Sequence, residues 1–202
     1  LSKVDEKIEK LTKKKELLEQ YKKGIMQKIF SQEIRFKDDN GKEFPEWEEK
    51  EVEEIFNTIS TKEYQIKASE IVENGLFPVI DQGQKLVAGY CNDKQKLFFE
   101  ELPVIIYGDH TTIIKYINYD FVIGADGTKI LKNKIDGNLK FLYYSLCYNN
   151  IEPEGYKRHF SIIRKVLLNL PSLPEQQKIA YFLSSLDKKI DIALQELGQV
   201  QE

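Results

Sequence analysis

The sequence predicts an α+β fold, in which a β-rich domain with a mixed or antiparallel sheet is flanked by two long α-helices that form an antiparallel coiled coil. Three observations support this fold class. Apolar residues recur at heptad-compatible spacings at both ends of the chain. Between about residues 76 and 135, short β-rich runs alternate with Asp and Gly. The 202 residues are 41% hydrophobic, with 11 Phe and 11 Tyr, which excludes a wholly disordered chain.

The first 30 residues predict one long helix. They contain no Pro, and Gly24 is their only Gly. Apolar residues are spaced by three, four or seven positions, as in a coiled-coil seam, and Lys15 and Lys22 occupy two further seam positions. The apolar seam residues are Leu1, Val4, Ile8, Leu11, Leu18, Ile25 and Ile29. We assign residues 1–36 to this first helical segment, because the acidic, turn-rich stretch at residues 38–47 ends it.

Residues 37–170 are expected to form the central domain, which has the usual size of a single domain. The predicted strands are residues 77–80, 86–91, 97–99, 104–107, 113–117, 121–124, 129–131 and 166–170. A helix is predicted at residues 138–149, because Leu139, Leu142 and Leu146 fall on one side of it. The last strand leads directly into the second long helix.

Residues 171–202 predict that second helix. Ser172 and Glu175 have the spacing of a capping box, and Pro174 falls in the first turn, where its missing N–H leaves no helix hydrogen bond unmade. The apolar residues then keep a heptad step to the end of the segment. They are Ile179, Leu183, Leu186, Ile190, Ala193, Leu197 and Val200. Seams as regular as these must be buried against a partner, and we expect the two helices to pack against each other.

The two helical segments are related in sequence. Residues 1–8 (LSKVDEKI) and residues 183–190 (LSSLDKKI) share the pattern L-S-x-(V/L)-D-x-K-I at an offset of 182 residues and in the same heptad register. This relation indicates a repeat, and therefore a larger array of domain, helix, domain and helix. We expect this chain to carry one domain of such an array with parts of both helices.

Charge is distributed unevenly along the chain. The net charge is −3. Residues 1–30 hold nine Lys against five acids, residues 31–75 hold thirteen acids against six bases, and residues 127–170 hold eight bases against three acids. A local basic face on an acidic protein is compatible with a DNA partner, because phosphates respond to the nearby field.

Signatures of enzymes and of membrane proteins are missing from the sequence. No apolar run is long enough to span a bilayer. There is no P-loop, no GxGxxG and no HExxH. Cys91 and Cys147 stand far apart without a CxxC pattern, which disfavours a zinc site or disulfide scaffold and favours a reducing cytoplasm. We therefore expect a cytoplasmic, non-catalytic protein with no metal or cofactor of its own.

Two polar segments are candidates for contact with DNA. Residues 108–112 form a turn after an apolar strand, and the alternative for this turn is an Asx-turn in which Asp109 bonds its own backbone. Residues 154–161 combine aromatic, cationic and hydroxyl side chains, and the alternative is a solvated charged loop. Arg can bind guanine bidentately, whereas Lys mostly contacts phosphates. With two lysines that follow glycines, the candidates are Lys85, His110, Thr111, Thr112, Lys129, Tyr156, Lys157, Arg158, His159 and Ser161.

Residues 170–180 (LPSLPEQQKIA), together with residues 183–190, resemble the conserved region of the specificity subunits of type I restriction–modification systems. The resemblance continues at residues 77–80 (FPVI), 89–90 (GY) and 142–144 (LYY), which are similar to the family's target recognition domain. Residues 24–30 (GIMQKIF) resemble the end of its central conserved helix. Residues 1–36 then correspond to the C-terminal part of that helix, residues 37–170 to the recognition domain, and residues 171–202 to a truncated distal conserved helix.

The resemblance implies a subunit that recognises double-stranded DNA without catalysing a reaction. One recognition domain would bind half of a bipartite target, and the helices would act as a spacer. It also implies that the helices dock modification subunits, which bind S-adenosylmethionine, and indirectly restriction subunits, which use ATP and Mg²⁺. The seam residues expected to serve in pairing and subunit docking are Val4, Ile8, Leu11, Leu18, Ile25, Ile179, Leu183, Leu186, Ile190 and Leu197. The chain would be a fragment, or a natural half-length subunit that forms a dimer through its helices.

Two other functions remain open at the level of sequence. The first is a protein-interaction module that uses its helices and binds no DNA. The second, more remote, is a metal-dependent nuclease, because Glu48-Glu49-Lys50 matches the (D/E)-x-K triplet of such enzymes. With 33 acids and 30 bases in the chain, this triplet is expected by chance.

Overall fold

A computed structural model describes residues 3–62, 64–124, 127–155 and 157–201. The chain divides into two compact units, a helical unit made of residues up to 46 and from 171 onward, and a β-rich unit of residues 47–170. The division after residue 170 coincides with the expected boundary, whereas residues 37–46 group with the helices instead of the central domain.

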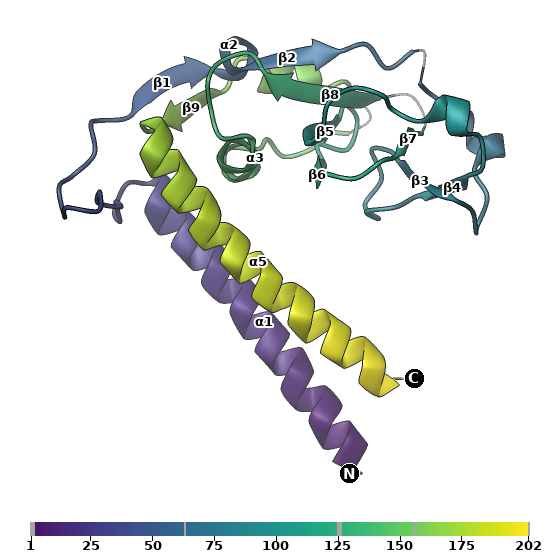
Figure 1. Ribbon diagram of the computed structural model, residues 1–202, viewed down its shortest axis with the longest axis horizontal. Helices are drawn as coiled ribbons and strands as arrows, with labels where there is room; N and C mark the ends of the chain where they lie inside the picture. Colours follow the sequence, from purple (N-terminus) through teal and green to yellow (C-terminus); the bar gives the residue numbers. More distant parts are fainter. Residues whose placement is uncertain (1–2, 63, 125–126, 156, 202) are drawn as a thin grey trace. The chain divides into compact units, whose positions relative to one another are not determined.

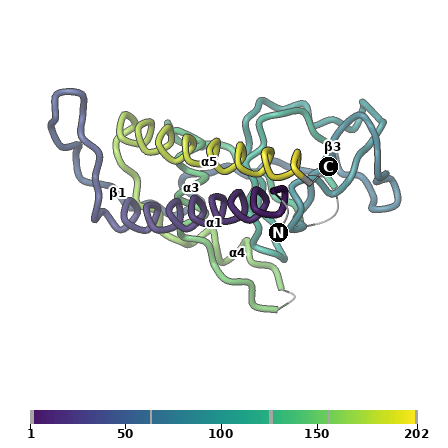
Figure 2. Tube along the Cα trace, turned by 90° about the horizontal axis from the view of Figure 1, so that it is seen from below, coloured from purple at the N-terminus to yellow at the C-terminus, as the bar shows by residue number. Residues whose placement is uncertain are grey.

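The helical unit is an antiparallel pair of long helices, α1 (Lys3–Phe30) and α5 (Leu173–Gln201), which lie side by side in both views (Figures 1 and 2). Lys22 forms an ion pair with Asp187, and Lys14 lies 3.2 Å from Glu196, so residue numbers increase in opposite directions along the two helices. The predicted antiparallel pairing is confirmed.

The predicted seam is buried along most of α5. Its fully or nearly fully buried residues are Ile179, Leu183, Leu186, Ile190 and Ala193. On α1 the burial is graded: Ile29 is buried, whereas Val4 near the first turn is 51% exposed. The seam residues Ile8, Leu11, Leu18, Ile25, Leu197 and Val200 are half-buried, and Leu1 lies outside the described residues. The two helices contact each other within the same chain, and burial of the seam is greatest along α5.

The start of α5 differs from the predicted capping box. The Glu175 carboxylate is fully buried and accepts hydrogen bonds from Arg35 Nε at 3.1 Å and Nη2 at 2.9 Å. The Ser172 hydroxyl is buried and has no hydrogen-bond partner within the described part of the chain. Gln176 Nε2 instead donates to the Pro171 carbonyl at 2.8 Å. The Ser172 half of the predicted box is wrong, because its hydroxyl makes no such bond, although Pro174 does occupy the first turn.

The β-rich unit contains a four-stranded antiparallel sheet in the order β2-β8-β5-β6 (Figure 1). Its strands are β2 (Phe56–Ile59), β8 (Thr128–Asn133), β5 (Val104–Gly108) and β6 (Ile114–Ile117). Three further strands form a mixed sheet in the order β4-β3-β7, in which β3 is antiparallel to β4 and parallel to β7. They are β3 (Phe77–Ile80), β4 (Gly89–Cys91) and β7 (Val122–Ile123). The predicted mixed, mainly antiparallel α+β class is confirmed.

The secondary structure of residues 48–59 is not predicted by the sequence pattern. This segment forms strand β1 (Glu48–Glu51), the short helix α2 (Val52–Ile55) and strand β2. Strand β1 pairs with the distant strand β9 (Leu167–Leu170), so its partner is supplied by the fold rather than by a neighbouring hairpin. The strand predicted at residues 97–99 is wrong, because within the described part of the chain that segment makes a single bridge, between Leu97 and Val122.

The core of the β-rich unit lies between its two larger sheets. The cluster that fills it consists of the buried side chains Ile80, Phe98, Val104, Ile106, Ile117, Phe121, Ile123 and Ile130. Burial of each such side chain stabilises the fold by roughly 1.5–3 kcal/mol before entropy is counted. Helix α3 (Leu139–Tyr148) contacts β5 and β6 and begins where the Asn138 side chain accepts a hydrogen bond from Phe141 N at 3.0 Å.

Three short helices complete the unit: the 3₁₀ helices at Ala68–Glu70 and Lys94–Lys96, and α4 (Phe160–Ile163). Helix α4 begins inside the segment that was predicted to be a loop up to residue 161. Among the described residues, no helix is long and apolar enough to span a membrane.

Candidate nucleic-acid interface

Four of the predicted DNA-contacting residues meet at one cavity in the β-rich unit. The cavity has a volume of about 670 Å³. Its lining residues are Thr61, Lys62, Gln65, Asp109, His110, Gly127, Thr128, Lys129, Lys157 and Arg158. They come from the segment after β2, the turn after β5, the start of β8 and the segment before α4. Folding thus brings His110, Lys129, Lys157 and Arg158 together.

The turn after β5 is held by Gln82, a residue that the sequence analysis did not select. The Gln82 side-chain oxygen accepts from His110 N at 3.0 Å, and the Gln82 carbonyl accepts from the Thr111 hydroxyl at 2.6 Å. Gly108 is required at the start of the turn, because a Cβ there would lie 2.2 Å from Thr111 Oγ1. The turn is therefore fixed by packing and by hydrogen bonds.

The start of β8 approaches the same turn closely. Gly127 has a φ of +87°, and a Cβ there would lie 2.6 Å from Gln82 Nε2 and 2.8 Å from the His110 ring. Only glycine combines this φ with this close approach at no steric cost. The His110 side chain is consequently kept at the wall of the cavity.

Asp109 joins three segments at the base of the cavity. Its side chain is almost fully buried. Asp109 N donates to the Gly127 carbonyl at 2.7 Å, Asp109 Oδ1 accepts from Phe160 N at 2.9 Å, and Lys129 Nζ lies 3.8 Å from Asp109 Oδ2. The Asx-turn alternative is wrong, because the Asp109 carboxylate contacts Phe160 N and Lys129, which are far away in sequence.

His159 is a buried residue and not an exposed contact. It has no exposed surface. His159 N donates to the Asp109 carbonyl at 2.7 Å, and ring atom Nε2 accepts from Glu154 N at 2.9 Å. Because Nε2 accepts, the ring proton is on Nδ1, which donates to the Asp109 carbonyl at 3.2 Å. The expected direct contact of His159 with DNA is corrected accordingly.

Four further predicted residues, Thr112, Thr111, Lys85 and Ser161, are described by the structure and are absent from the cavity lining. Thr112 is buried, with a φ of +58°, so its expected DNA contact is corrected as well. The Thr111 hydroxyl is occupied by Gln82. Lys85 and Ser161 are exposed, on the segment after β3 and on α4 respectively. Tyr156 lies outside the described residues.

The segment that carries Lys85 is held by a buried lysine. Lys115 Nζ donates to the Asp81 carbonyl at 2.7 Å and to the Lys85 carbonyl at 2.6 Å, and lies 3.6 Å from Asp81 Oδ1. Burial lowers the pKa of the Lys115 ammonium, and the Asp81 carboxylate opposes part of that decrease. This ammonium fixes the turn at residues 81–85 from the inside.

The cations around the cavity differ in how they are paired. Lys129 lies near Asp109, and Lys157 forms an ion pair with Glu154. Lys62 and Arg158 are exposed and make no ion pair among the described residues. Lys62 was missed because an isolated lysine in a polar segment carries no sequence signal.

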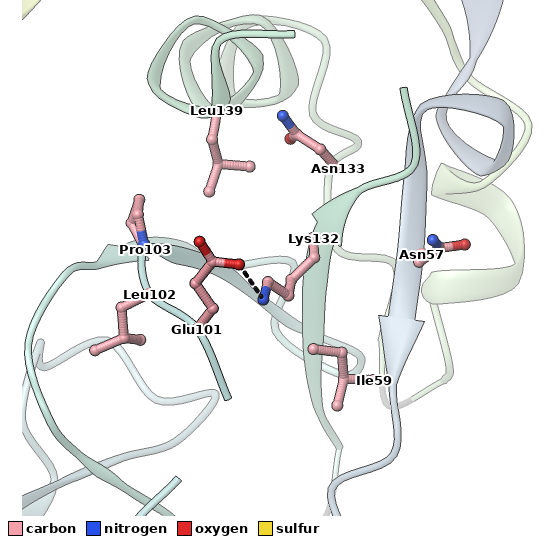
Figure 3. Close-up of a pocket in the computed structure, with 8 residues that line it drawn as sticks. All are labelled: Asn57, Ile59, Glu101, Leu102, Pro103, Lys132, Asn133 and Leu139. Atoms are coloured by element: carbon pink, nitrogen blue, oxygen red, sulfur yellow. Dashed lines mark ion pairs between the residues drawn. The ribbon is translucent and has the colours of Figure 1, made fainter. Parts of the chain in front are cut away.

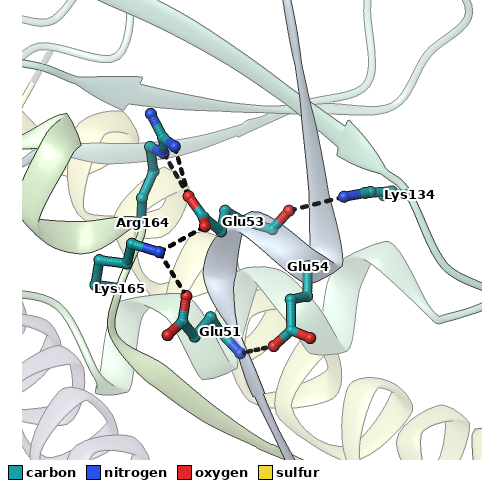
Figure 4. A network of polar contacts seen from close by, with 6 residues as sticks. All are labelled: Glu51, Glu53, Glu54, Lys134, Arg164 and Lys165. Atoms are coloured by element: carbon teal, nitrogen blue, oxygen red, sulfur yellow. Dashed lines mark hydrogen bonds and ion pairs between the residues drawn. The ribbon is translucent and has the colours of Figure 1, made fainter.

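A second group of cations is neutralised within the unit (Figure 4). Arg164 Nη2 lies 2.5 Å from Glu53 Oε2, and Lys165 Nζ lies 2.6 Å from Glu53 and 3.0 Å from Glu51. Lys134 Nζ donates to the Glu53 carbonyl at 3.2 Å. The ion pairs hold the pKa of the Glu53 carboxyl below its usual value, first through Lys165 and then through Arg164. Part of the basic stretch at residues 127–170 therefore cancels part of the acidic stretch at residues 31–75.

A smaller cavity of about 480 Å³ lies beside β2 and β8 (Figure 3). Its polar side chains include Asn57, Glu101, Lys132 and Asn133, and Glu101 lies 3.8 Å from Lys132. None of the predicted DNA-contacting residues lines this cavity. Among the described residues, no group of three or more His, Cys, Asp or Glu side chains is arranged to hold a metal ion.

Comparison with known proteins gives a consistent set of similarities. A family model described as the type I restriction modification DNA specificity domain matches residues 45–202. The EcoR124I/EcoR124II specificity subunit of Escherichia coli is 30% identical over 86 residues, which cover 41% of this chain and 21% of that protein. The MjaVIII specificity subunit of Methanocaldococcus jannaschii is 27% identical over 235 residues, which cover all of this chain and 55% of that protein.

Solved structures show the same fold. The S subunit of a type I restriction–modification system from M. genitalium aligns with 98% of this chain and 55% of its own, at a TM-score of 0.71 and 19% identity. The HsdS subunit from Thermoanaerobacter tengcongensis aligns with 95% of this chain and 50% of its own, at a TM-score of 0.54 and 20% identity. The chain spans about half the length of these structures and of the M. jannaschii relative.

Proposed function

The chain belongs to the family of type I restriction–modification DNA specificity domains, and we propose that its β-rich unit binds double-stranded DNA and recognises one half of a bipartite target. In this proposal the chain itself catalyses no reaction. Its α1–α5 pair acts as a spacer between recognition domains.

The cavity is the observation that carries the proposal. Three segments that are distant in sequence place Lys62, Lys129, Lys157 and Arg158 around it, with His110 at its wall. Lysine and arginine side chains that neutralise phosphates supply most of the sequence-independent affinity for DNA. Outside the cavity, Arg164 and Lys165 are paired with Glu51 and Glu53, whereas Lys62 and Arg158 at the cavity are exposed and make no ion pair among the described residues.

Roles follow from the pairing of each cation. Arg158 is exposed, and its guanidinium, which makes no ion pair with any described residue, can bind the O6 and N7 atoms of guanine or a phosphate. Lys62 and Lys157 are suited to phosphate contact, since an ammonium is a point charge with little base preference. Lys85, outside the cavity, would anchor the backbone further along the duplex.

The helix pair is proposed to dock the modification subunits, which would bring S-adenosylmethionine, and through them restriction subunits with ATP and Mg²⁺. The seam residues are covered within the chain, so a partner would contact the outer surface. Large apolar side chains are exposed there: Leu17 at 55%, Tyr21 at 54% and Tyr181 at 80%. This assignment moves docking from the seam residues to the outer face of the helices.

The test is DNA binding by the chain assembled with the modification subunit of its own system, measured at several salt concentrations. Replacing Arg158 with Ala is expected to weaken binding. If Arg158 contacts a phosphate, the slope of log K against log[salt] falls in magnitude by about 0.9. If it contacts guanine, discrimination at one base pair falls by about 1–3 kcal/mol.

Arg164→Ala is the matched control, because it removes the same charge from an arginine already bonded to Glu53. It should change neither the slope nor the sequence preference. Equal behaviour of the two variants would remove Arg158 from the interface. A complex that assembles but binds no DNA would favour a protein-interaction module instead.

A further inference from the structure

We propose that His159 is a positioning residue for DNA binding: its buried ring holds the Glu154–Arg158 segment against Asp109, so that Lys157 and Arg158 face the cavity. The inference rests on the proposed function and deepens it, because it identifies what orders the segment that carries two of the proposed DNA contacts.

The His159 side chain bonds to both ends of the Glu154–Arg158 segment. At its start, Glu154 N donates to His159 Nε2 at 2.9 Å. At its end, His159 N and Nδ1 both donate to the Asp109 carbonyl, at 2.7 and 3.2 Å. The ring therefore closes a loop of five residues onto a carbonyl that lies 50 positions away in sequence.

The Glu154–Arg158 segment has few other anchors. Glu154, Gly155, Lys157 and Arg158 are exposed. Their remaining described contacts are a bond from Lys157 N to the Gly155 carbonyl at 3.1 Å, a contact of 3.3 Å between His110 Nδ1 and the Lys157 carbonyl, and the ion pair between Lys157 and Glu154. Without the ring, an exposed segment of this kind would have to be ordered when DNA binds, and the ordering would reduce affinity.

Asp109 ties this anchor to the rest of the cavity. The same residue bonds the start of β8 through Gly127 and the start of α4 through Phe160 N. Lys129, from β8, lies at its carboxylate. Asp109 thereby fixes the position of the Glu154–Arg158 segment relative to β8, the strand that supplies Lys129.

Two substitutions of His159 test the roles of its two ring nitrogens separately. His159→Gln places an amide oxygen near the position of Nε2, where it can still accept from Glu154 N. His159→Asn places an amide N–H near the position of Nδ1, where it can still donate to Asp109 O, but it leaves Glu154 N without an acceptor. Tyr107→Phe is the matched control, because it alters another buried side chain in the same unit whose hydroxyl has no partner among the described residues.

The experiment measures DNA affinity and salt dependence of each variant in the complex with the modification subunit, at a temperature at which calorimetry shows every variant to be folded. We expect His159→Asn to weaken binding about five- to tenfold, as for loss of one buried hydrogen bond. His159→Gln and Tyr107→Phe should bind within about twofold of the wild type. The slope against log[salt] should be unchanged in all of them, because no phosphate contact is removed.

Amide hydrogen exchange at Glu154 gives a second measurement that requires no DNA. Exchange should be faster in His159→Asn than in the wild type and close to the wild-type rate in His159→Gln. Full affinity of a folded His159→Asn variant, or equal losses in both variants, would overturn the inference. A wild-type complex that binds no DNA would overturn the proposed function itself, which makes the two failures distinguishable.

Discussion

The Tyr107 hydroxyl shows how a single buried polar atom can lower stability. Tyr107 has no exposed surface, and its hydroxyl has no hydrogen-bond partner among the described residues. Burial raises the pKa of this hydroxyl far above its ordinary value, with a further contribution from the nearby Asp109 charge. A buried hydroxyl that forms no hydrogen bond is unfavourable, because it has lost its bonds to water.

Replacing Tyr107 with Phe is therefore expected to increase the free energy of unfolding by about 1 kcal/mol, because the lost hydroxyl makes no bond. Urea denaturation followed by circular dichroism measures the change. A variant that is less stable than the wild type by a similar amount would show that the hydroxyl is bonded in solution.

Lys115 is a buried polar side chain that does form hydrogen bonds, in contrast to the Tyr107 hydroxyl. Its ammonium is almost fully buried and serves the carbonyls of Asp81 and Lys85. Lys115→Met should lower the free energy of unfolding by about 2 kcal/mol, since the carbonyls lose their donor. Lys132→Met is the control, because its partner Glu101 is mostly exposed and 3.8 Å away, and it should cost about 0.5 kcal/mol or less. Equal costs for the two would mean that Lys115 does not order the turn.

At the residue scale, the sequence could select cations in loops as candidate DNA contacts, and those contacts stay predictions. The fold places three of the candidates, Lys129, Lys157 and Arg158, around one cavity. His159 and Thr112 were selected by the same criterion of polar side chains in loops, yet both are buried. A polar residue that bonds a distant backbone group has the same local sequence as one that faces solvent, so only the fold separates the two.

At the scale of elements, the start of α5 depends on a contact that crosses the helical unit. Arg35 follows α1, and Glu175 lies in the first turn of α5. The bidentate bond between them is buried on the glutamate side and raises the pKa of the Arg35 guanidinium, chiefly through that hydrogen bond. Arg35 Nη2 also donates to the Pro45 carbonyl at 2.7 Å, which ties the segment after α1 to the same point.

Arg35→Ala should destabilise the protein by about 3 kcal/mol, because it removes both guanidinium bonds to the buried Glu175 carboxylate. Combining it with Glu175→Ala should recover part of the loss. Lys178→Ala is the matched control within the same unit, since its partner Asp39 is 93% exposed, and it should cost about 0.5 kcal/mol or less. Thermal denaturation of these three variants and the wild type tests this, and a small effect of Arg35→Ala would show that water reaches Glu175.

Elements were predictable from sequence where local pattern and tertiary environment agree. The two long helices have heptad seams, and β3 at Phe77–Ile80 matches its predicted bounds. Strand β1 was missed because Glu48–Glu51 has no apolar alternation and low intrinsic strand propensity. It is stabilised by β9 and by the ion pair between Glu51 and Lys165, both supplied by residues more than a hundred positions away.

At the scale of the whole molecule, the sequence repeat and the helix pairing coincide. Lys14 and Glu196 face each other, and they are separated by 182 positions, which is the offset of the repeat. The contact therefore joins equivalent positions of two related helices. In an antiparallel pair of related helices, equivalent positions meet only where a two-fold axis crosses the pair. A local pseudo-two-fold axis near Lys14 and Glu196 therefore relates α1 to α5.

The helix pair also sets the expected assembly of the chain. The apolar seam is covered within one chain, so we expect light scattering to give the mass of a single chain across a dilution series. Leu183→Lys, at a fully buried seam position, should separate α1 from α5, lower the helix content and cause association through the exposed seam. Tyr181→Lys changes an adjacent residue that is 80% exposed and should leave the helix content and the monomeric mass unchanged.

The Tyr181→Lys variant also decides which surface binds the modification subunit. If docking uses the outer face of the helices, Tyr181→Lys should weaken co-migration with that subunit while the helix pair stays intact. If docking instead uses the seam, a partner must first open the pair, and Tyr181→Lys should have no effect on binding. A stable dimer of the wild-type chain would contradict the expected mass. Because the seam residues must also be buried in a dimer that forms through these helices, such a dimer would indicate that α1 of one copy pairs with α5 of another.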